Sequence, residues 1–171
     1  MITDEIEIKL ADRIWIAVAL LQRENPSRED FDREEIRRKL RETGLMKGLK
    51  PQSVAAHLQE HLVANVPPSS TKYLMLYQTR PRFLRLLRMG DNIDPGRQSS
   101  RPSKHIPKRD EVPANYLPLL DWYEEWSRQA PPVQPFNYED DPLIRLIGSG
   151  KHIWADEHAD EYVENLRRED I

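Results

Sequence analysis

Apolar residues recur with helical spacing near the start of the chain, at i, i+4, i+7, i+8 and i+11. This spacing predicts one helix with a buried face, which ends at the Asn25-Pro26-Ser27 turn. Trp15 and Ile16 widen the apolar stripe and indicate burial on more than one side. The stripe consists of Leu10, Ile14, Ala17, Val18 and Leu21.

A second helix is marked by its capping residues. Asp32 and Glu35 have the spacing of a capping box, and Phe31 and Ile36 that of a hydrophobic staple. Gly44 stands where a C-terminal cap is expected. We expect Ile36 and Leu40 to be buried and the arginines at 33, 37, 38 and 41 to remain solvated.

Pro51 predicts the first position of a third helix, which ends at Asn65 and the following prolines. Val54, Leu58 and Leu62 have the spacing of its buried face. Its outward positions are small or polar: Gln52, Ser53, Ala56, His57, Gln59 and Glu60.

The period then changes to two, over residues 73–78 and again over 82–87. Thr79-Arg80-Pro81 separates the two runs, so a β-hairpin is predicted. Three helices followed by a hairpin is the order of a winged helix-turn-helix, in which the third helix enters the major groove. The predicted fold class is therefore α+β and mainly helical, with this domain and a basic linker in residues 1–110.

The charge of the chain is divided unevenly. The 171 residues carry a net charge of −3, but residues 1–110 contain 21 Lys+Arg against 15 Asp+Glu, and residues 111–171 contain 5 against 14. Such asymmetry suggests a different partner for each half, although a folded domain with a solvating acidic tail is the alternative. Seven cations surround the predicted third helix and hairpin: Lys47, Lys50, Lys72, Arg80, Arg82, Arg85 and Arg88.

These features predict a DNA-binding surface. Gln52, Ser53 and His57 are the candidates for reading base edges. Lys50, Lys72, Arg80 and Arg82 are the candidates for phosphate contacts, which act at any base sequence. The alternative is a winged helix that docks proteins and binds no DNA.

Residues 90–113 show no periodicity and are interpreted as a solvated linker, with a DNA-tracking basic arm as the alternative. A short aromatic helix follows within residues 111–130, and its stripe either packs on the first domain, which we favour, or mediates dimerisation. The stripe is Leu119, Leu120, Tyr123 and Trp126.

The last segment, residues 131–171, combines a proline-rich spacer with two short apolar stretches that include acidic residues. Stretches of this length cannot bury their own apolar faces, so an extended, partly helical tail that requires a partner surface is expected. Its predicted anchors are Leu143, Ile147, Trp154, Tyr162 and Leu166.

The run from Asp141 through Gly148-Ser149-Gly150-Lys151 to Val163 resembles the C-terminal neutralising segment of VapB-type antitoxins of type II toxin–antitoxin systems. The resemblance covers about the last thirty residues. It implies a DNA-binding domain followed by a tail that wraps a PIN-domain ribonuclease toxin. The predicted winged helix departs from the usual DNA-binding domains of that family, which are small ribbon-helix-helix or swapped-hairpin folds.

The resemblance also implies a mode of inhibition, in which a cation of the tail enters the carboxylate cluster that holds the toxin's metal. Lys151, Arg145 and Arg167 or Arg168 are the inserting candidates, and Trp154 is the apolar anchor. For the arginines, a solvated helix face is the alternative.

Other chemistry finds little support in the sequence. The absence of Cys excludes a disulfide framework and a thiol nucleophile, and Gly148-Ser149-Gly150-Lys151 lacks the remaining residues of a phosphate loop. His57 and His61 have no evident third metal ligand. We therefore expect no enzyme, cofactor or metal. No apolar run is long enough to span a membrane, and the acidic N-terminus lacks signal-peptide features, so a cytoplasmic location is expected.

The leading hypothesis is an antitoxin that inhibits a PIN-domain ribonuclease and represses its own operon, as a homodimer or in a hetero-oligomer with the toxin. An adaptor without a DNA ligand and a transcription regulator whose tail completes its own domain are the alternatives.

Overall fold

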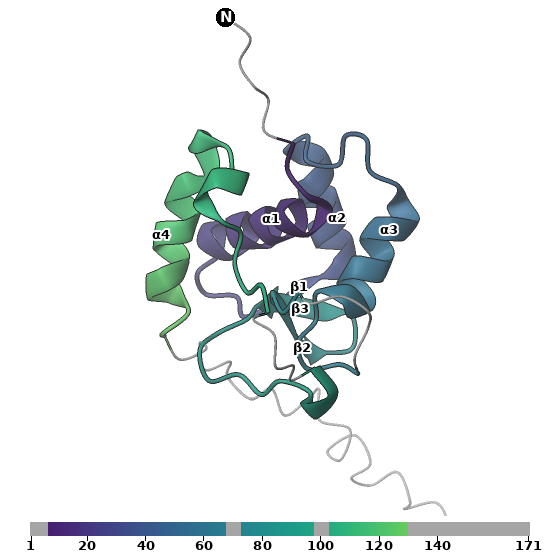
Figure 1. Ribbon diagram of the computed structural model, residues 1–171, viewed down its shortest axis with the longest axis vertical. Helices are drawn as coiled ribbons and strands as arrows, with labels where there is room; N and C mark the ends of the chain where they lie inside the picture. Colours follow the sequence, from purple (N-terminus) through teal and green to yellow (C-terminus); the bar gives the residue numbers. More distant parts are fainter. Residues whose placement is uncertain (1–6, 68–72, 98–102, 130–171) are drawn as a thin grey trace, which may run out of the picture. The chain divides into compact units, whose positions relative to one another are not determined.

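The computed structural model describes residues 7–67, 73–97 and 103–129 (Figure 1). This described part has an α+β fold with four α-helices and one small antiparallel sheet. The α-helices are α1 (Leu10–Glu24), α2 (Arg33–Glu42), α3 (Pro51–Ala56) and α4 (Leu117–Trp126), and the strands are β1 (Phe31–Asp32), β2 (Leu76–Arg80) and β3 (Phe83–Leu86).

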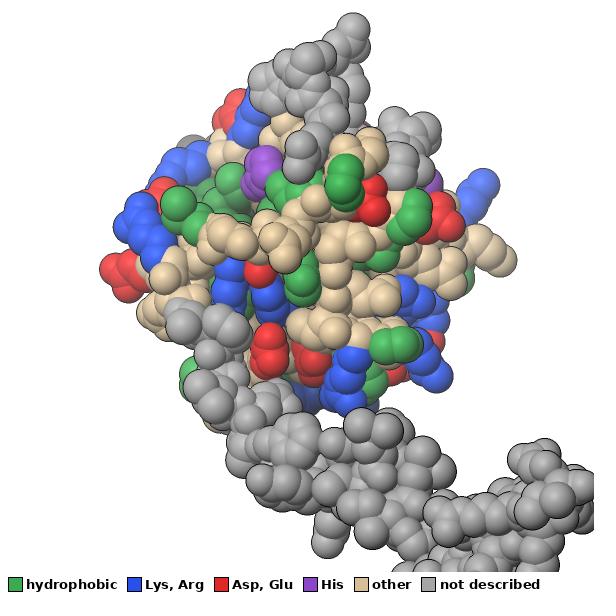
Figure 2. Space-filling model, turned by 90° about the horizontal axis from the view of Figure 1, so that it is seen from below, with side chains coloured by type: hydrophobic (Ala, Val, Ile, Leu, Met, Phe, Trp, Pro, Cys, Tyr) green, Lys and Arg blue, Asp and Glu red, His purple; other side chains and the backbone are tan. Residues whose placement is uncertain are grey.

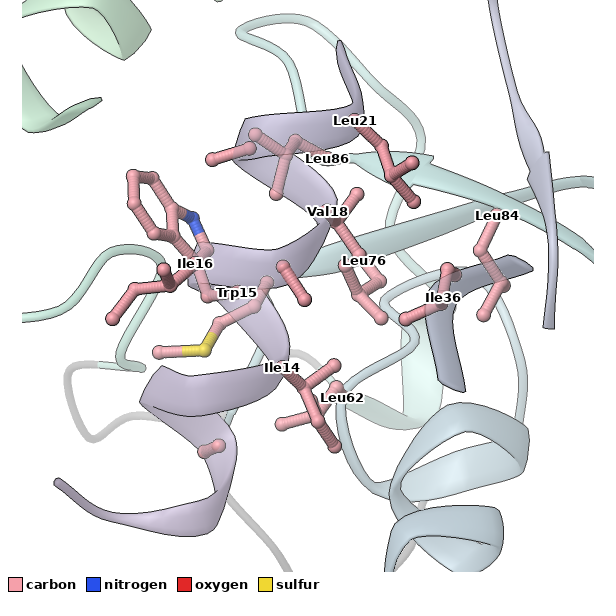
Figure 3. Close-up of a cluster of buried hydrophobic side chains, with 14 of the residues drawn as sticks. Ile14, Trp15, Ile16, Val18, Leu21, Ile36, Leu62, Leu76, Leu84 and Leu86 are labelled. Carbon is pink, nitrogen blue, oxygen red and sulfur yellow. The ribbon is translucent and has the colours of Figure 1, made fainter. Parts of the chain in front are cut away.

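The central helix is α1, which contacts α2, α4 and β3 (Figures 1 and 3). Ile14, Trp15, Ile16 and Val18 are fully buried, and this confirms that the helix is covered on more than one side. The side chain and the backbone N–H of Asn25 both donate to the Leu21 carbonyl and so end the helix.

The predicted caps of α2 are confirmed. The Asp32 carboxylate accepts from the Glu34 N–H at 2.8 Å, and Glu35 Oε2 accepts from the Asp32 N–H at 3.0 Å, which completes the capping box. At the other end Gly44 has a φ of +73° and follows the capping residue Thr43, as a helix C-terminus requires.

The sheet has the order β1-β3-β2, and both strand pairs are antiparallel. The β2–β3 hairpin confirms the predicted one, but its turn is displaced. A bulge between Gln78 and Arg80 lengthens β2, so the tip consists of Pro81 and Arg82 rather than Thr79-Arg80-Pro81. Leu84 and Leu86 point into the core with Ile36, Leu62 and Leu76 (Figure 3).

The described part of residues 90–113 packs against the domain. The prediction that this segment is a solvated linker is therefore wrong. The Lys104 Nζ lies 2.8 and 2.9 Å from the two carboxylate oxygens of the fully buried Asp12 on α1, and it also donates to Glu111 at 2.6 Å. The Lys104 carbonyl accepts from the Leu74 N–H at 2.9 Å. The segment is therefore fastened to both α1 and the chain that enters β2.

The aromatic helix α4 packs against α1 and buries the stripe that the sequence indicates. The Trp15 and Tyr123 rings meet edge to face with centroids 5.4 Å apart, and the Tyr123 hydroxyl donates to the Leu87 carbonyl at 2.6 Å. Leu119, Leu120 and Trp126 belong to the same core as α1. Within the described residues no helix has the length and apolar character of a membrane span.

Candidate nucleic-acid interface

The N-terminal end of α3 presents the first set of candidate residues. Lys50 precedes the helix in an extended conformation, and Pro51 occupies the first helical turn without needing an N–H partner. Val54 is fully buried and so fixes the rotation of the helix. Lys50 and Gln52 are consequently exposed and Ser53 is half-buried.

The third helix does not continue as an α-helix to Asn65, contrary to the prediction. After Ala56 it changes to a π-helical turn, η1 (His57–His61), and the Leu62 N–H donates to the His57 carbonyl at 3.1 Å. Leu58 and Leu62 are still fully buried, as their spacing predicts. The turn alters the direction of the residues that follow His57.

Arg97 holds the end of this helix, a role that the sequence did not reveal. Its side chain donates to the carbonyls of Glu60, Val66 and Pro67, with a distance of 3.0 Å to Val66. The residue is buried, and it lies in a 3-10 turn, η2 (Pro95–Arg97), within the predicted linker. Glu60 belongs to η1 and Val66 and Pro67 follow it, so Arg97 fastens the chain after the helix to the helix end.

His57 is a half-buried candidate for base contacts. Its Nδ1 lies 2.8 Å from the Ser53 carbonyl, and burial lowers the pKa of the ring, which is therefore neutral at pH 7. A neutral ring that donates from Nδ1 presents Nε2 as an acceptor. The His57 and His61 rings lie 4.9 Å apart, and no group of three His, Cys, Asp or Glu suited to a metal occurs among the described residues.

The tip of the hairpin presents Arg80 and Arg82, both exposed. Each has an acidic neighbour in or beside β1: Arg80 lies 3.5 Å from Asp30, and Arg82 lies 3.5 Å from Asp32. The Arg80 guanidinium also covers the Phe83 ring at 3.5 Å. The two carboxylates are largely buried, but the Arg80 and Arg82 side chains are 59% and 66% exposed, so both cations remain accessible to a phosphate.

Arg33, the first residue of α2, joins this tip, although the sequence indicated only a solvated helix face. Its N–H donates to the Arg82 carbonyl at 3.1 Å, and its guanidinium donates to the Gln78 side chain at 3.2 Å. Burial is the main cause that lowers the pKa of the Arg33 guanidinium, and the positive charges of the nearby Arg37 and Arg82 lower it further. The guanidinium groups of Arg33 and Arg37 on α2 and of Arg82 at the hairpin tip therefore lie near one another.

Two cations that the sequence assigned to the basic surface are buried, which corrects that assignment. Arg85 is 4% exposed; it donates to both carboxylate oxygens of Asp91, at 2.6 and 2.7 Å, and covers the Tyr77 ring. Arg88 is 6% exposed and lies against Trp126. Neither side chain can reach a phosphate, because burial against α4 and Asp91 holds it inside.

The two candidate sets belong to one connected unit. The Asn65 side chain donates to the Gln78 carbonyl and accepts from the Gln78 N–H, at 2.8 and 2.9 Å. The Ala64 N–H donates to the Leu76 carbonyl at 2.8 Å. The end of η1 is thus fastened to β2, and the hairpin cannot move independently of the third helix.

The surface is not uniformly positive. On the face seen in Figure 2, Lys and Arg side chains are interspersed with Asp and Glu.

Lys72 and all predicted toxin contacts lie outside the described residues. Those contacts are Leu143, Arg145, Ile147, Lys151, Trp154, Tyr162, Leu166 and Arg167.

Comparisons with models of known families, with curated proteins and with solved structures find no match for this chain.

Proposed function

We propose that residues 10–88 form a winged helix that binds DNA. The observation that carries this proposal is the order of elements, α1-β1-α2-α3-β2-β3, combined with the sheet order β1-β3-β2. In this arrangement the third helix supplies the major-groove contacts and the β2–β3 turn supplies the wing. The two-residue β1, which the sequence did not indicate, supports the interpretation because it pairs with β3.

The proposed roles follow from exposure. Gln52, Ser53 and His57 read base edges from α3 and its π-helical extension. Lys50 contacts a phosphate at the start of that helix, and Arg80 and Arg82 contact phosphates from the wing. Lys72 remains a candidate from the sequence. Because Asp30 and Asp32 reduce the positive potential of the wing, we expect moderate affinity with a shallow salt dependence.

We further propose that this domain belongs to an antitoxin. Support comes from the resemblance of the tail to VapB-type neutralising segments and from the apolar anchors and isolated cations of that tail. In this proposal the toxin-bound tail places Lys151 or Arg145 in a carboxylate cluster, and the domain represses the operon.

Binding to upstream DNA, measured by fluorescence anisotropy at several salt concentrations, tests the first proposal. Lys50→Ala should weaken binding to all sequences and reduce the salt slope by about one. Gln52→Ala should weaken binding to the preferred sequence and leave non-specific binding unchanged. Lys108→Ala, at an exposed lysine outside α3 and the wing, is the matched control. Equal effects of all three variants would contradict the assignment.

Co-expression with the adjacent reading frame tests the antitoxin proposal. The full chain should restore growth when that frame encodes a toxic nuclease, and deletion of residues 141–171 should abolish the protection. Protection by the truncated chain would contradict the proposed role of the tail.

A protein-docking domain is the second candidate, and one observation favours it. Arg80 and Arg82 each have an acidic neighbour, and Arg85 and Arg88 are buried, so the described surface has fewer available cations than the sequence suggested. Absence of DNA binding at low salt would favour this candidate.

A further inference from the structure

A cavity of about 520 Å³ opens beside the second half of α4. Its apolar lining includes Leu87, Ile93 and Ile106, and charged residues of α4 stand at its rim. An apolar depression with a polar rim is typical of an interaction site on a soluble protein. Figure 1 shows α4 and α3 on opposite sides of α1, so this face is separate from the proposed base-reading residues.

Met89 stands at the edge of this cavity as an apolar protrusion. Its surface is 72% exposed, and within the described part of the chain it is the one exposed large hydrophobic residue. Its N–H donates to the Ser127 carbonyl at the end of α4, at 3.1 Å. The Asp91 carboxylate closes the turn around it by accepting from the Arg88 N–H at 2.6 Å. The backbone of the protrusion is therefore fixed relative to α4, while the unbranched side chain can adapt to an irregular apolar gap.

Two opposite charges of α4 line the same cavity. Glu124 and Arg128 are both exposed, and neither side chain forms an ion pair with a described residue. Residues four apart on a helix are neighbours on its surface, so the two charges lie one above the other along α4. Against an antiparallel copy of the same helix, Glu124 of one chain faces Arg128 of the other, and the reverse pair forms as well. The charge pattern of this face is therefore complementary to itself.

We propose that this face is a homodimer interface, in which two copies of the chain meet about a two-fold axis with their α4 helices antiparallel. A two-fold interface uses the same patch on both copies, so a protrusion near the axis lies next to the cavity that receives its counterpart. Met89 of each copy enters the cavity of the other, and Glu124 and Arg128 form two equivalent ion pairs across the axis. The inference does not depend on the proposed function.

Sedimentation velocity of the full chain over a wide range of concentrations tests the proposal. Two inserted side chains and two exposed ion pairs make a small interface, so we expect a reversible dimer with a dissociation constant in the micromolar range. Met89→Asp places a charge in the apolar cavity of the other copy and should raise the dissociation constant about tenfold or more. A chain that stays monomeric at every concentration, or a dimer that Met89→Asp leaves intact, would overturn the proposal.

A charge exchange tests the antiparallel arrangement. Glu124→Arg and Arg128→Glu each place like charges opposite one another in both ion pairs, and each alone should raise the dissociation constant about fivefold. The double variant regenerates both pairs with the signs reversed and should return to within about twofold of the native value. Glu125→Arg, at an exposed residue of α4 outside the cavity, changes the net charge as Glu124→Arg does and should have little effect. Weakening in both single variants without recovery in the double variant would overturn the two-fold arrangement.

Discussion

The backbone N–H of Arg33 donates to the carbonyl of Arg82 over 3.1 Å, so the first residue of α2 holds the tip of the hairpin. Arg82 has a φ of +72° there, a conformation that is unfavourable for a side chain other than glycine or asparagine. Among the described non-glycine residues it alone has a positive φ. An arginine in a strained turn suggests that its side chain is retained for binding.

Arg82→Gly should therefore stabilise the fold and weaken DNA binding. Relief of the left-handed conformation, partly offset by the greater freedom of glycine in the unfolded chain, should raise the free energy of unfolding by about 0.5–1 kcal/mol. Arg82→Ala keeps the Cβ and should give no such gain. Both variants should lose DNA affinity equally. Urea denaturation and anisotropy measure the two effects, and a stabilised Ala variant would contradict the explanation.

Arg85→Met should destabilise the domain without a specific effect on DNA. The substitution leaves the Asp91 carboxylate, which is mostly buried, without the guanidinium that holds it at 2.6 and 2.7 Å. Loss of one partner of such a pair costs about 3 kcal/mol. Addition of Asp91→Asn should recover part of this loss in a double-mutant cycle. A loss of DNA affinity in the folded variant would instead restore Arg85 to the binding surface.

The stability of the domain should depend on Glu111 in acid. Hydrogen bonds from Lys104 and Lys9 lower the pKa of the Glu111 carboxyl to about 2 in the folded chain, below its ordinary value of 4.5. Its contribution is therefore complete above pH 4.5 and disappears as the pH falls towards 2. The difference in unfolding free energy between the native chain and Glu111→Gln should narrow over this range.

Lys9→Met provides the matched comparison for Glu111. It removes one of the two hydrogen-bond donors to Glu111. The pH range over which the Glu111 contribution to stability is lost should therefore move to higher pH, and the contribution should not vanish. The Asp12 carboxyl affects the pH dependence of stability in the opposite direction. Burial raises its pKa, so its contribution to the free energy of unfolding falls as the pH rises. A difference between native chain and Glu111→Gln that stays constant from pH 7 to pH 2 would refute the proposed linkage.

Tyr123 should make the stability of the domain depend on pH in alkali. Burial raises the pKa of its phenol to about 12, against 10 in the unfolded chain. Above pH 10 the unfolded chain releases this proton first, so stability should fall between pH 10 and 12. Tyr123→Phe should remove that component and, because the bond to the Leu87 carbonyl is lost, cost about 1 kcal/mol at pH 7. Spectrophotometric titration of the phenols and urea denaturation provide the measurements.

The elements with local signals were predictable from the sequence. The capping box of Asp32 and Glu35, the glycine at 44 and the proline at 51 act within a few residues, and each appears in the structure as expected. The apolar period also predicted a buried α1, and Trp15 and Ile16 predicted its burial on more than one side. These signals determine local conformation and do not depend on the remainder of the fold.

The remaining features depend on contacts between distant segments. The strand β1 exists because Phe31 pairs with Leu84, and Lys104 is anchored by Asp12 across 92 residues. Arg85 and Arg88 were assigned to the basic surface because of their charge, yet Asp91 pairs with Arg85 and α4 covers Arg88. A cationic side chain is predicted as exposed by default, and only its distant partner can reverse that expectation.

The contact between Trp15 and Tyr123 has a consequence for synthesis of the chain. The central helix leaves the ribosome long before α4, which covers one of its faces, has been made. At the usual rate of translation, the interval of about 100 residues lasts roughly 5–20 seconds. During that interval the indole of Trp15 lacks one of its packing partners, so the domain reaches its native state only after α4 has emerged.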